Sequence, residues 1–193
     1  RRLVSRTAWL RCAWPCHPQN WSCQPTRRLW YLPIFCGVAL ATVPARGDIV
    51  NDFSGNWMSV YDEAPMGQSF TAVDPTVHTI SFGVTDFNWS QYPDDHKLTV
   101  ILRSGAGFGG AVVGVVTVTN IPIYYDDWLD FVFDPPLSVS VGSTYTFEIK
   151  GETRRWGVER DQSTPDTYLE GHAWRLGAVW SGVDLRFRVF AAS

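Results

Sequence analysis

From residue 48 onward, apolar and polar residues alternate over short segments, with the period of two that is typical of β-strands having one face toward a core. The clearest segments are 97–103, 128–133, 144–150 and 184–190. The residues expected to point inward are Leu98, Val100, Leu102, Leu129, Phe131, Phe133, Tyr145, Phe147, Ile149, Leu185, Phe187 and Val189. Weaker strand patterns occur near 67–72, 77–84, 111–119, 154–160 and 168–176.

Turn-forming residues separate these segments, as in Asp74-Pro75, Asp134-Pro135 and Gly142-Ser143. No segment keeps a helical period for more than two turns. Short strands with one polar face and frequent turns favour antiparallel sheets. The chain is therefore predicted to be all-β, an antiparallel β-sandwich with jelly-roll-like connections.

The first 47 residues follow a different pattern. Arg27-Arg28 precedes a mainly apolar run at 29–43, and small residues, Ala45 and Gly47, follow it. This is the layout of a secretory signal peptide, and the run is too short for a comfortable membrane span. We expect 26–47 to be a signal peptide, 1–25 to be a non-structural upstream segment, and 48–193 to be a secreted or cell-surface module with no membrane span.

Charge and cysteine content divide the chain at the same place. Residues 1–47 contain seven arginines, all four cysteines and no acidic residue. Residues 48–193 contain nine basic and nineteen acidic residues, a net charge of −10. A module this acidic repels a phosphate backbone, which argues against nucleic-acid binding. Without cysteine it has neither a disulfide nor a thiolate nucleophile.

The order of the strand segments resembles the choice-of-anchor type of bacterial surface module, which is associated with PEP-CTERM sorting tails. The resemblance covers most of residues 66–191. The segments that carry it are Gln68-Ser-Phe-Thr-Ala72, Thr79-Ile-Ser-Phe82, Leu98-Thr-Val-Ile-Leu-Arg103, Pro136-Leu-Ser-Val-Ser-Val-Gly-Ser-Thr-Tyr145, Tyr168-Leu-Glu-Gly-His172 and Asp184-Leu-Arg-Phe-Arg-Val-Phe190. The resemblance implies an exported jelly-roll domain.

The number of tryptophans is the strongest indication of a ligand. Six tryptophans follow residue 48, more than one sandwich core needs. An exposed indole ring can cover the apolar C–H face of a sugar while neighbouring polar groups bind its hydroxyls. The ligand-binding residues predicted on this basis are Trp128, Trp156, Trp174, Arg154 and His172. The corresponding hypothesis is a non-catalytic module that binds carbohydrate or a cell-surface polymer.

Acidic loops offer two further interpretations. Asp126, Asp127 and Asp130 could hold a structural Ca²⁺ together with backbone carbonyls. Paired carboxylates could instead serve a jelly-roll glycosidase or lyase, provided that two acids, or an acid and His96 or His172, meet in one cleft. The acidic candidates for that chemistry are Asp94 with Asp95, Asp126 with Asp127 and Asp130, and Glu159 with Asp161.

Other catalytic patterns are weak. The segment 105–110 matches G-x-G-x-x-G, but a β-branched, strand-like run follows it where a dinucleotide site needs a helix, so a glycine loop between two strands is the better interpretation. No serine lies in G-x-S-x-G, which leaves acyl transfer without support. We therefore predict no enzyme activity, and keep a purely structural envelope or matrix protein as a third hypothesis.

Overall fold

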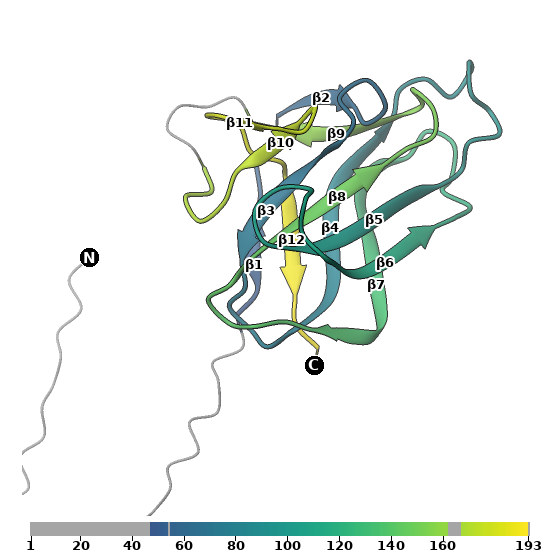
Figure 1. Ribbon diagram of the computed structural model, residues 1–193. Coiled ribbons are helices and arrows are strands. Elements are labelled where there is room, and N and C mark those ends of the chain that lie inside the picture. The colour runs from purple at the N-terminus through teal and green to yellow at the C-terminus, as the bar shows by residue number, and fades with distance from the viewer. Residues whose placement is uncertain (1–46, 54, 162–166, 193) are drawn as a thin grey trace, which may run out of the picture. The chain divides into compact units, whose positions relative to one another are not determined.

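The computed structural model describes residues 47–53, 55–161 and 167–192, which form two antiparallel β-sheets facing each other (Figure 1). The described part lies in the compact unit Thr42–Ser193. The segment 1–25, and the predicted signal peptide apart from Gly47, lie outside the described residues. The strands are β1 (Ile49–Asn51), β2 (Asn56–Ser59), β3 (Met66–Thr71), β4 (Thr76–Asp86), β5 (Leu98–Ser104), β6 (Val112–Val118), β7 (Asp126–Ser138), β8 (Thr144–Lys150), β9 (Trp156–Arg160), β10 (Ala173–Arg175), β11 (Ala178–Trp180) and β12 (Phe187–Phe190).

The first sheet is built around the long strand β4. Strand β7 pairs with one side of β4, and β12 and β9 pair with successive parts of its other side, followed outward by β1 and β2. The second sheet has the order β11-β10-β3-β8-β5-β6. All the pairings are antiparallel, which confirms the predicted sandwich; the jelly-roll connectivity stays a prediction.

The core lies between the sheets and consists of the side chains that the alternation assigned to it. All twelve residues expected to point inward are buried. Phe82 of β4 stacks on Phe131 of β7, with ring centroids 4.8 Å apart, and on Phe147 of β8 in the opposite sheet at 6.1 Å. Removing a buried phenylalanine of this kind costs about 3–5 kcal/mol. The two sheets are therefore joined through an aromatic centre.

The strand pattern is less accurate at the ends of the chain. The short strands β1, β2 and β11 were not predicted, and the segment expected near 168–176 contains only β10. Strands of three or four residues hold too few positions to reveal an alternation. These elements form because β12, β9 and β10 offer them a partner.

The outward face of the second sheet is more covered than the alternation suggests. Thr146 and Glu148 on β8 have the parity of solvent-facing residues, yet both are buried. The glycine loop between β5 and β6 folds over them: Gly107 donates its backbone N–H to the Thr146 hydroxyl at 2.8 Å. Arg103 covers Glu148 and donates to its carboxylate at 2.8 Å. The alternation alone places these two side chains on the outer face, and they are buried there because this loop and this ion pair shield them.

Strand β6 forms one edge of the second sheet and carries the exposed side chains Val112 and Val115. The edge is partly closed by β7, since a Cβ atom on Gly114 would lie 2.4 Å from the Leu137 side chain. Within the described ranges, no helix is long and apolar enough to cross a membrane.

Candidate functional site

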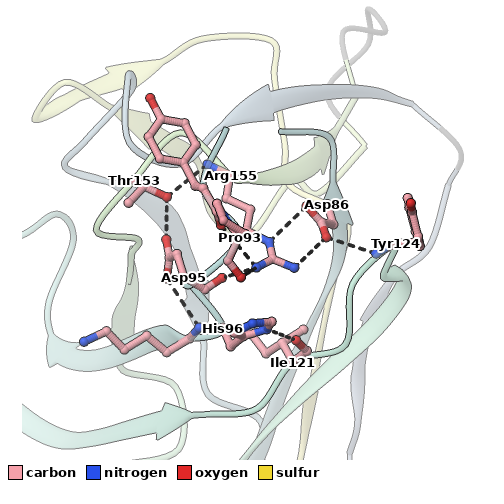
Figure 2. Close-up of polar contacts among 10 residues, drawn as sticks. Asp86, Pro93, Asp95, His96, Ile121, Tyr124, Thr153 and Arg155 are labelled. Atoms are coloured by element: carbon pink, nitrogen blue, oxygen red, sulfur yellow. Dashed lines mark hydrogen bonds and ion pairs between the residues drawn. The ribbon is translucent and has the colours of Figure 1, made fainter. Parts of the chain in front are cut away.

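A buried arginine ties together the loops at one end of the sandwich (Figure 2). Arg155 precedes β9, and its side chain and that of Asp86, the last residue of β4, are both 0% exposed. Arg155 donates from Nε and Nη2 to the two carboxylate oxygens of Asp86, at 3.1 and 2.8 Å. Its Nη1 donates to the backbone carbonyls of Tyr92, Pro93 and Asp95, at 3.3, 3.1 and 2.8 Å. Every nitrogen of the guanidinium is therefore bound, as a buried charge requires.

This ion pair also fixes a second loop, between β6 and β7. The backbone N–H of Tyr124 donates to Asp86 Oδ2 at 3.0 Å, and the backbone N–H of Asp86 donates to the carbonyl of Tyr125 at 2.8 Å. The base of the loop is closed by His96, whose Nδ1 lies 2.9 Å from the carbonyl oxygen of Ile121 (Figure 2). The β4–β5 and β6–β7 loops are therefore held in one arrangement.

Two exposed aromatic rings project from these two loops. Trp89 and Tyr124 are 39% and 62% exposed. Their ring centroids lie 4.9 Å apart with the ring planes at 66°, an edge-to-face contact. Tyr124 has φ of +61°, a left-handed backbone conformation that residues other than glycine rarely adopt. We call Trp89 and Tyr124 the aromatic loop pair.

The aromatic loop pair presents apolar ring surface to solvent. Large apolar rings exposed on a rigid frame offer contact area at a low cost in conformational entropy. Exposed polar side chains, Gln91 and Asp94, follow Trp89 in the same loop. The amide and carboxylate oxygens of these two side chains can accept hydrogen bonds.

Trp128, the first of the predicted ligand-binding residues, is already covered by protein. It lies on the outward face of the first sheet, where the guanidinium carbons of Arg188 and Arg186 lie 3.7 and 4.4 Å from its ring centroid. Both arginines donate to Asp52, each at 2.8 Å, and Arg186 also donates to Glu159 at 2.7 Å. Although burial acts in the opposite direction, the bonds from Arg188 and Arg186 hold the pKa of Asp52 below its ordinary value. We call this group the Trp128 stack.

The other two predicted tryptophans have different surroundings. Trp156 is 0% exposed and points into the core beside Val158, so its prediction as part of an exposed platform is wrong. Its parity on β9 is that of the inward-facing Val158. Trp174 lies on the outer face of the second sheet, in edge-to-face contact with Phe108, with 6.0 Å between the ring centroids. A Cβ atom on Gly107 would lie 2.9 Å from the Trp174 ring. The glycine loop therefore packs on its indole ring.

Of the two predicted polar partners, His172 lies near one of these tryptophans: the indole Nε1 of Trp174 donates to the Ser69 hydroxyl at 3.4 Å, the group to which His172 also donates. Arg154 is exposed at the loop end and pairs with Asp62 at 2.7 Å. His172 precedes β10, where its backbone N–H donates to the Ser69 hydroxyl at 2.8 Å. The predicted residues are distributed over the core, both outer sheet faces and the loop end. The structure does not bring them together as one site.

The predicted calcium ligands are separated by the alternation of β7. Asp126 and Asp130 share the parity of the outward Trp128, whereas Asp127 has the parity of the inward Leu129. Asp130 accepts a hydrogen bond from the Ser81 hydroxyl at 2.5 Å, and Asp127 accepts one from the backbone of Trp128 at 2.7 Å. Within the described part of the chain, no group of three or more His, Cys, Asp or Glu side chains could hold a metal ion. These aspartates do not converge on a common position.

The fold and the loop end together define a β-sandwich with an aromatic surface on braced loops. No protein-family model matches the chain, and no curated protein matches it. The aromatic loop pair and the buried ion pair were not among the residues predicted from sequence. A signal was present in the adjacent aromatics of Tyr124-Tyr125 and in Trp89 near a turn, but neither segment has a periodicity that would orient its side chains.

Proposed function

We propose that residues 48–193 form a non-catalytic carbohydrate-binding module, with the aromatic loop pair as its sugar platform. The observation that carries the proposal is the exposure of Trp89 and Tyr124 on loops that Arg155 and Asp86 fix. Adjacent exposed aromatic rings form an apolar patch of the kind that marks binding sites, and tryptophan and tyrosine are common among the residues that dominate binding energies. A fixed frame reduces the entropy lost on binding.

Binding of the full chain to a glycan array and to insoluble polysaccharides tests this proposal. For a glycan that binds, Trp89→Ala and Tyr124→Ala should each weaken the affinity at least about tenfold, equivalent to about 1.4 kcal/mol. Trp57→Ala is the matched control, because Trp57 on β2 is exposed to nearly the same extent, 38%, and lies outside the pair. Failure of the wild-type chain to bind any glycan, or an equal loss in all three variants, would remove the proposal.

We also propose that the module acts outside the cytoplasm, secreted or at a cell surface. The signal-peptide pattern of residues 26–47 and the resemblance to choice-of-anchor surface modules support this location. Expression in a secreting host, followed by N-terminal sequencing of the exported chain, should give Asp48 as the first residue. Retention in the cytoplasm with residues 26–47 intact contradicts it.

A further inference from the structure

A second tryptophan, Trp180 at the end of β11, also lies between two arginines. The guanidinium carbons of Arg175 on β10 and Arg160 on β9 are 4.5 and 4.8 Å from its ring centroid. Trp180 is partly buried against the hydrophobic core. We call this group the Trp180 stack.

The guanidinium of Arg160 is incompletely bonded. Its Nε and Nη1 atoms are buried, and within residues 47–53, 55–161 and 167–192 neither has a hydrogen-bond partner. Arg160 has the same parity on β9 as Trp156 and Val158, so its side chain lies on the core side of the sheet, although the residue as a whole is partly exposed. Burying charged donors without acceptors costs several kcal/mol unless an acceptor is supplied.

The charges in the Trp180 stack are also unbalanced. Arg175 pairs with Glu63, with 3.3 Å between Nε and Oε2, so that among the described residues the two guanidinium groups have one paired carboxylate between them. Burial first, and then the charge of Arg175, lower the pKa of Arg160, whereas Glu63 opposes this effect. The environment of Arg160 therefore disfavours its positive charge.

The Trp128 stack shows how the same arrangement is completed elsewhere in this protein. There, two arginines on one tryptophan are joined by Asp52, and Glu159 adds a second carboxylate. In the Trp180 stack, Glu63 pairs with Arg175, and among the described residues Arg160 Nε and Nη1 have no acceptor. An oxyanion with acceptor atoms for Arg160 would complete the Trp180 stack in the same way.

We propose that the Trp180 stack binds an oxyanion, a carboxylate, sulfate or phosphate group, between Arg160 and Arg175. Arginine is the residue best suited to such groups because its planar donors are always charged. The side chain of Arg175 is 39% exposed, so the stack is open to solvent from that side. This site is independent of the aromatic loop pair.

The test measures the thermal midpoint and tryptophan fluorescence of the full chain during titration with sodium phosphate, sulfate or acetate at constant ionic strength set by chloride. A bound oxyanion should raise the midpoint continuously with concentration and change the fluorescence along a saturating curve. The phosphate and sulfate arms distinguish tetrahedral anions from the carboxylate of acetate. Binding of any one of them above the chloride baseline supports the proposal.

Two variants and a matched control locate the effect. Arg160→Gln and Arg175→Gln should each weaken the anion affinity at least about tenfold, the loss expected when one charged hydrogen-bonding partner is removed. Arg188→Gln removes an arginine from the Trp128 stack and should retain the wild-type affinity. Arg175 is the more exposed of the two, so its variant keeps the test decisive if Arg160→Gln does not fold. Equal midpoints in all salts, or equal losses in all three variants, would overturn the proposal.

Discussion

At the scale of single residues, adjacent arginines have opposite roles. Arg154 is exposed and pairs with Asp62 at the surface, whereas Arg155 is fully buried and all its nitrogens are bound. An exposed ion pair contributes about 0–1 kcal/mol because water already solvates both charges. A buried pair behaves differently, since loss of one partner leaves the other charge unsolvated.

We predict that Arg155→Met destabilises the protein by about 3–5 kcal/mol, because Asp86 and three backbone carbonyls lose their partner. Arg154→Met, one residue earlier, is the matched control and should cost less than about 1 kcal/mol. Urea denaturation followed by far-UV circular dichroism measures both. Similar costs for the two variants would mean that the buried pair does not brace the loops.

The sequence did not distinguish these two arginines, because both fell in the strand predicted at 154–160, whereas the structure places them in the turn before β9, where strand parity assigns no face. The burial of Trp156 could have been predicted, because Trp156 has the same parity as Val158, an apolar β-branched residue expected to point inward. The opposite parities of Asp126 and Asp127 were likewise implied once Leu129 and Phe131 were assigned to the core. Trp89 and Tyr124 lie in loops, where burial depends on contacts between distant segments rather than on period.

At the scale of elements, the glycine loop between β5 and β6 covers part of a sheet face. Gly105 and Gly107 both have positive φ, +81° and +82°. Their surroundings differ, because a Cβ atom on Gly105 would meet nothing within 4 Å, whereas one on Gly107 would lie 2.9 Å from the Trp174 ring. The two positions therefore separate backbone strain from packing.

We predict that Gly105→Ala costs about 1–2 kcal/mol, the strain of a left-handed alanine. Gly107→Ala should cost at least about 1 kcal/mol more, because overpacking against Trp174 is added to the same strain. The free energies of unfolding in urea give both values. Equal losses of stability in the two variants would show that the Trp174 ring can move away from the added methyl group and is not held in place by the loop.

Strand β6 is an edge element of a different kind. Its sequence, Val-Val-Gly-Val-Val-Thr-Val, is β-prone and lacks charge and proline, the composition that promotes pairing between chains. Contact with β7 protects only part of it.

Replacing Val115, which is 57% exposed, by lysine should reduce aggregation at high protein concentration while changing stability by no more than about 0.5 kcal/mol. Light scattering while the protein is concentrated measures the onset of aggregation, both in this variant and in Thr117→Lys on the same strand. An unchanged onset of aggregation in both variants would place the self-association elsewhere.

At the scale of the whole molecule, alternation was sufficient to predict the architecture. The inward residues of β5, β7, β8 and β12 all reached the core because a period of two is preserved over strands of this length. The pairing order was not predictable, since β4 is flanked on one side by two different strands and nothing local in its sequence marks the change. Short strands such as β1 depend on partners already in place.

The stability of the whole fold should depend on alkaline pH through Tyr168. Its ring packs edge-to-face on Phe187 with centroids 5.1 Å apart, and burial, against an opposing hydrogen bond from the Thr71 backbone, raises its pKa to about 12. The unfolded chain has the ordinary value of about 10. The neutral phenol therefore contributes stability that is complete below pH 10 and is lost as the pH rises toward 12.

We predict that the free energy of unfolding falls between pH 10 and 12, and that it falls less steeply in Tyr168→Phe, which has no proton to lose. Urea denaturation at half-unit steps from pH 9 to 12 measures this difference. Parallel curves for the two proteins would assign the alkaline transition to other groups. Tyr145→Phe, on β8, is the control for the loss of a different tyrosine hydroxyl.

Because Arg155 uses all its nitrogens within the protein, the loops that carry Trp89 and Tyr124 derive their shape from groups beneath the surface. The exposed rings of Trp89 and Tyr124 can therefore be substituted independently of the buried ion pair. Under the proposed function, exchange of either ring would change the ligand that is bound and leave the ion pair of Asp86 and Arg155 in place.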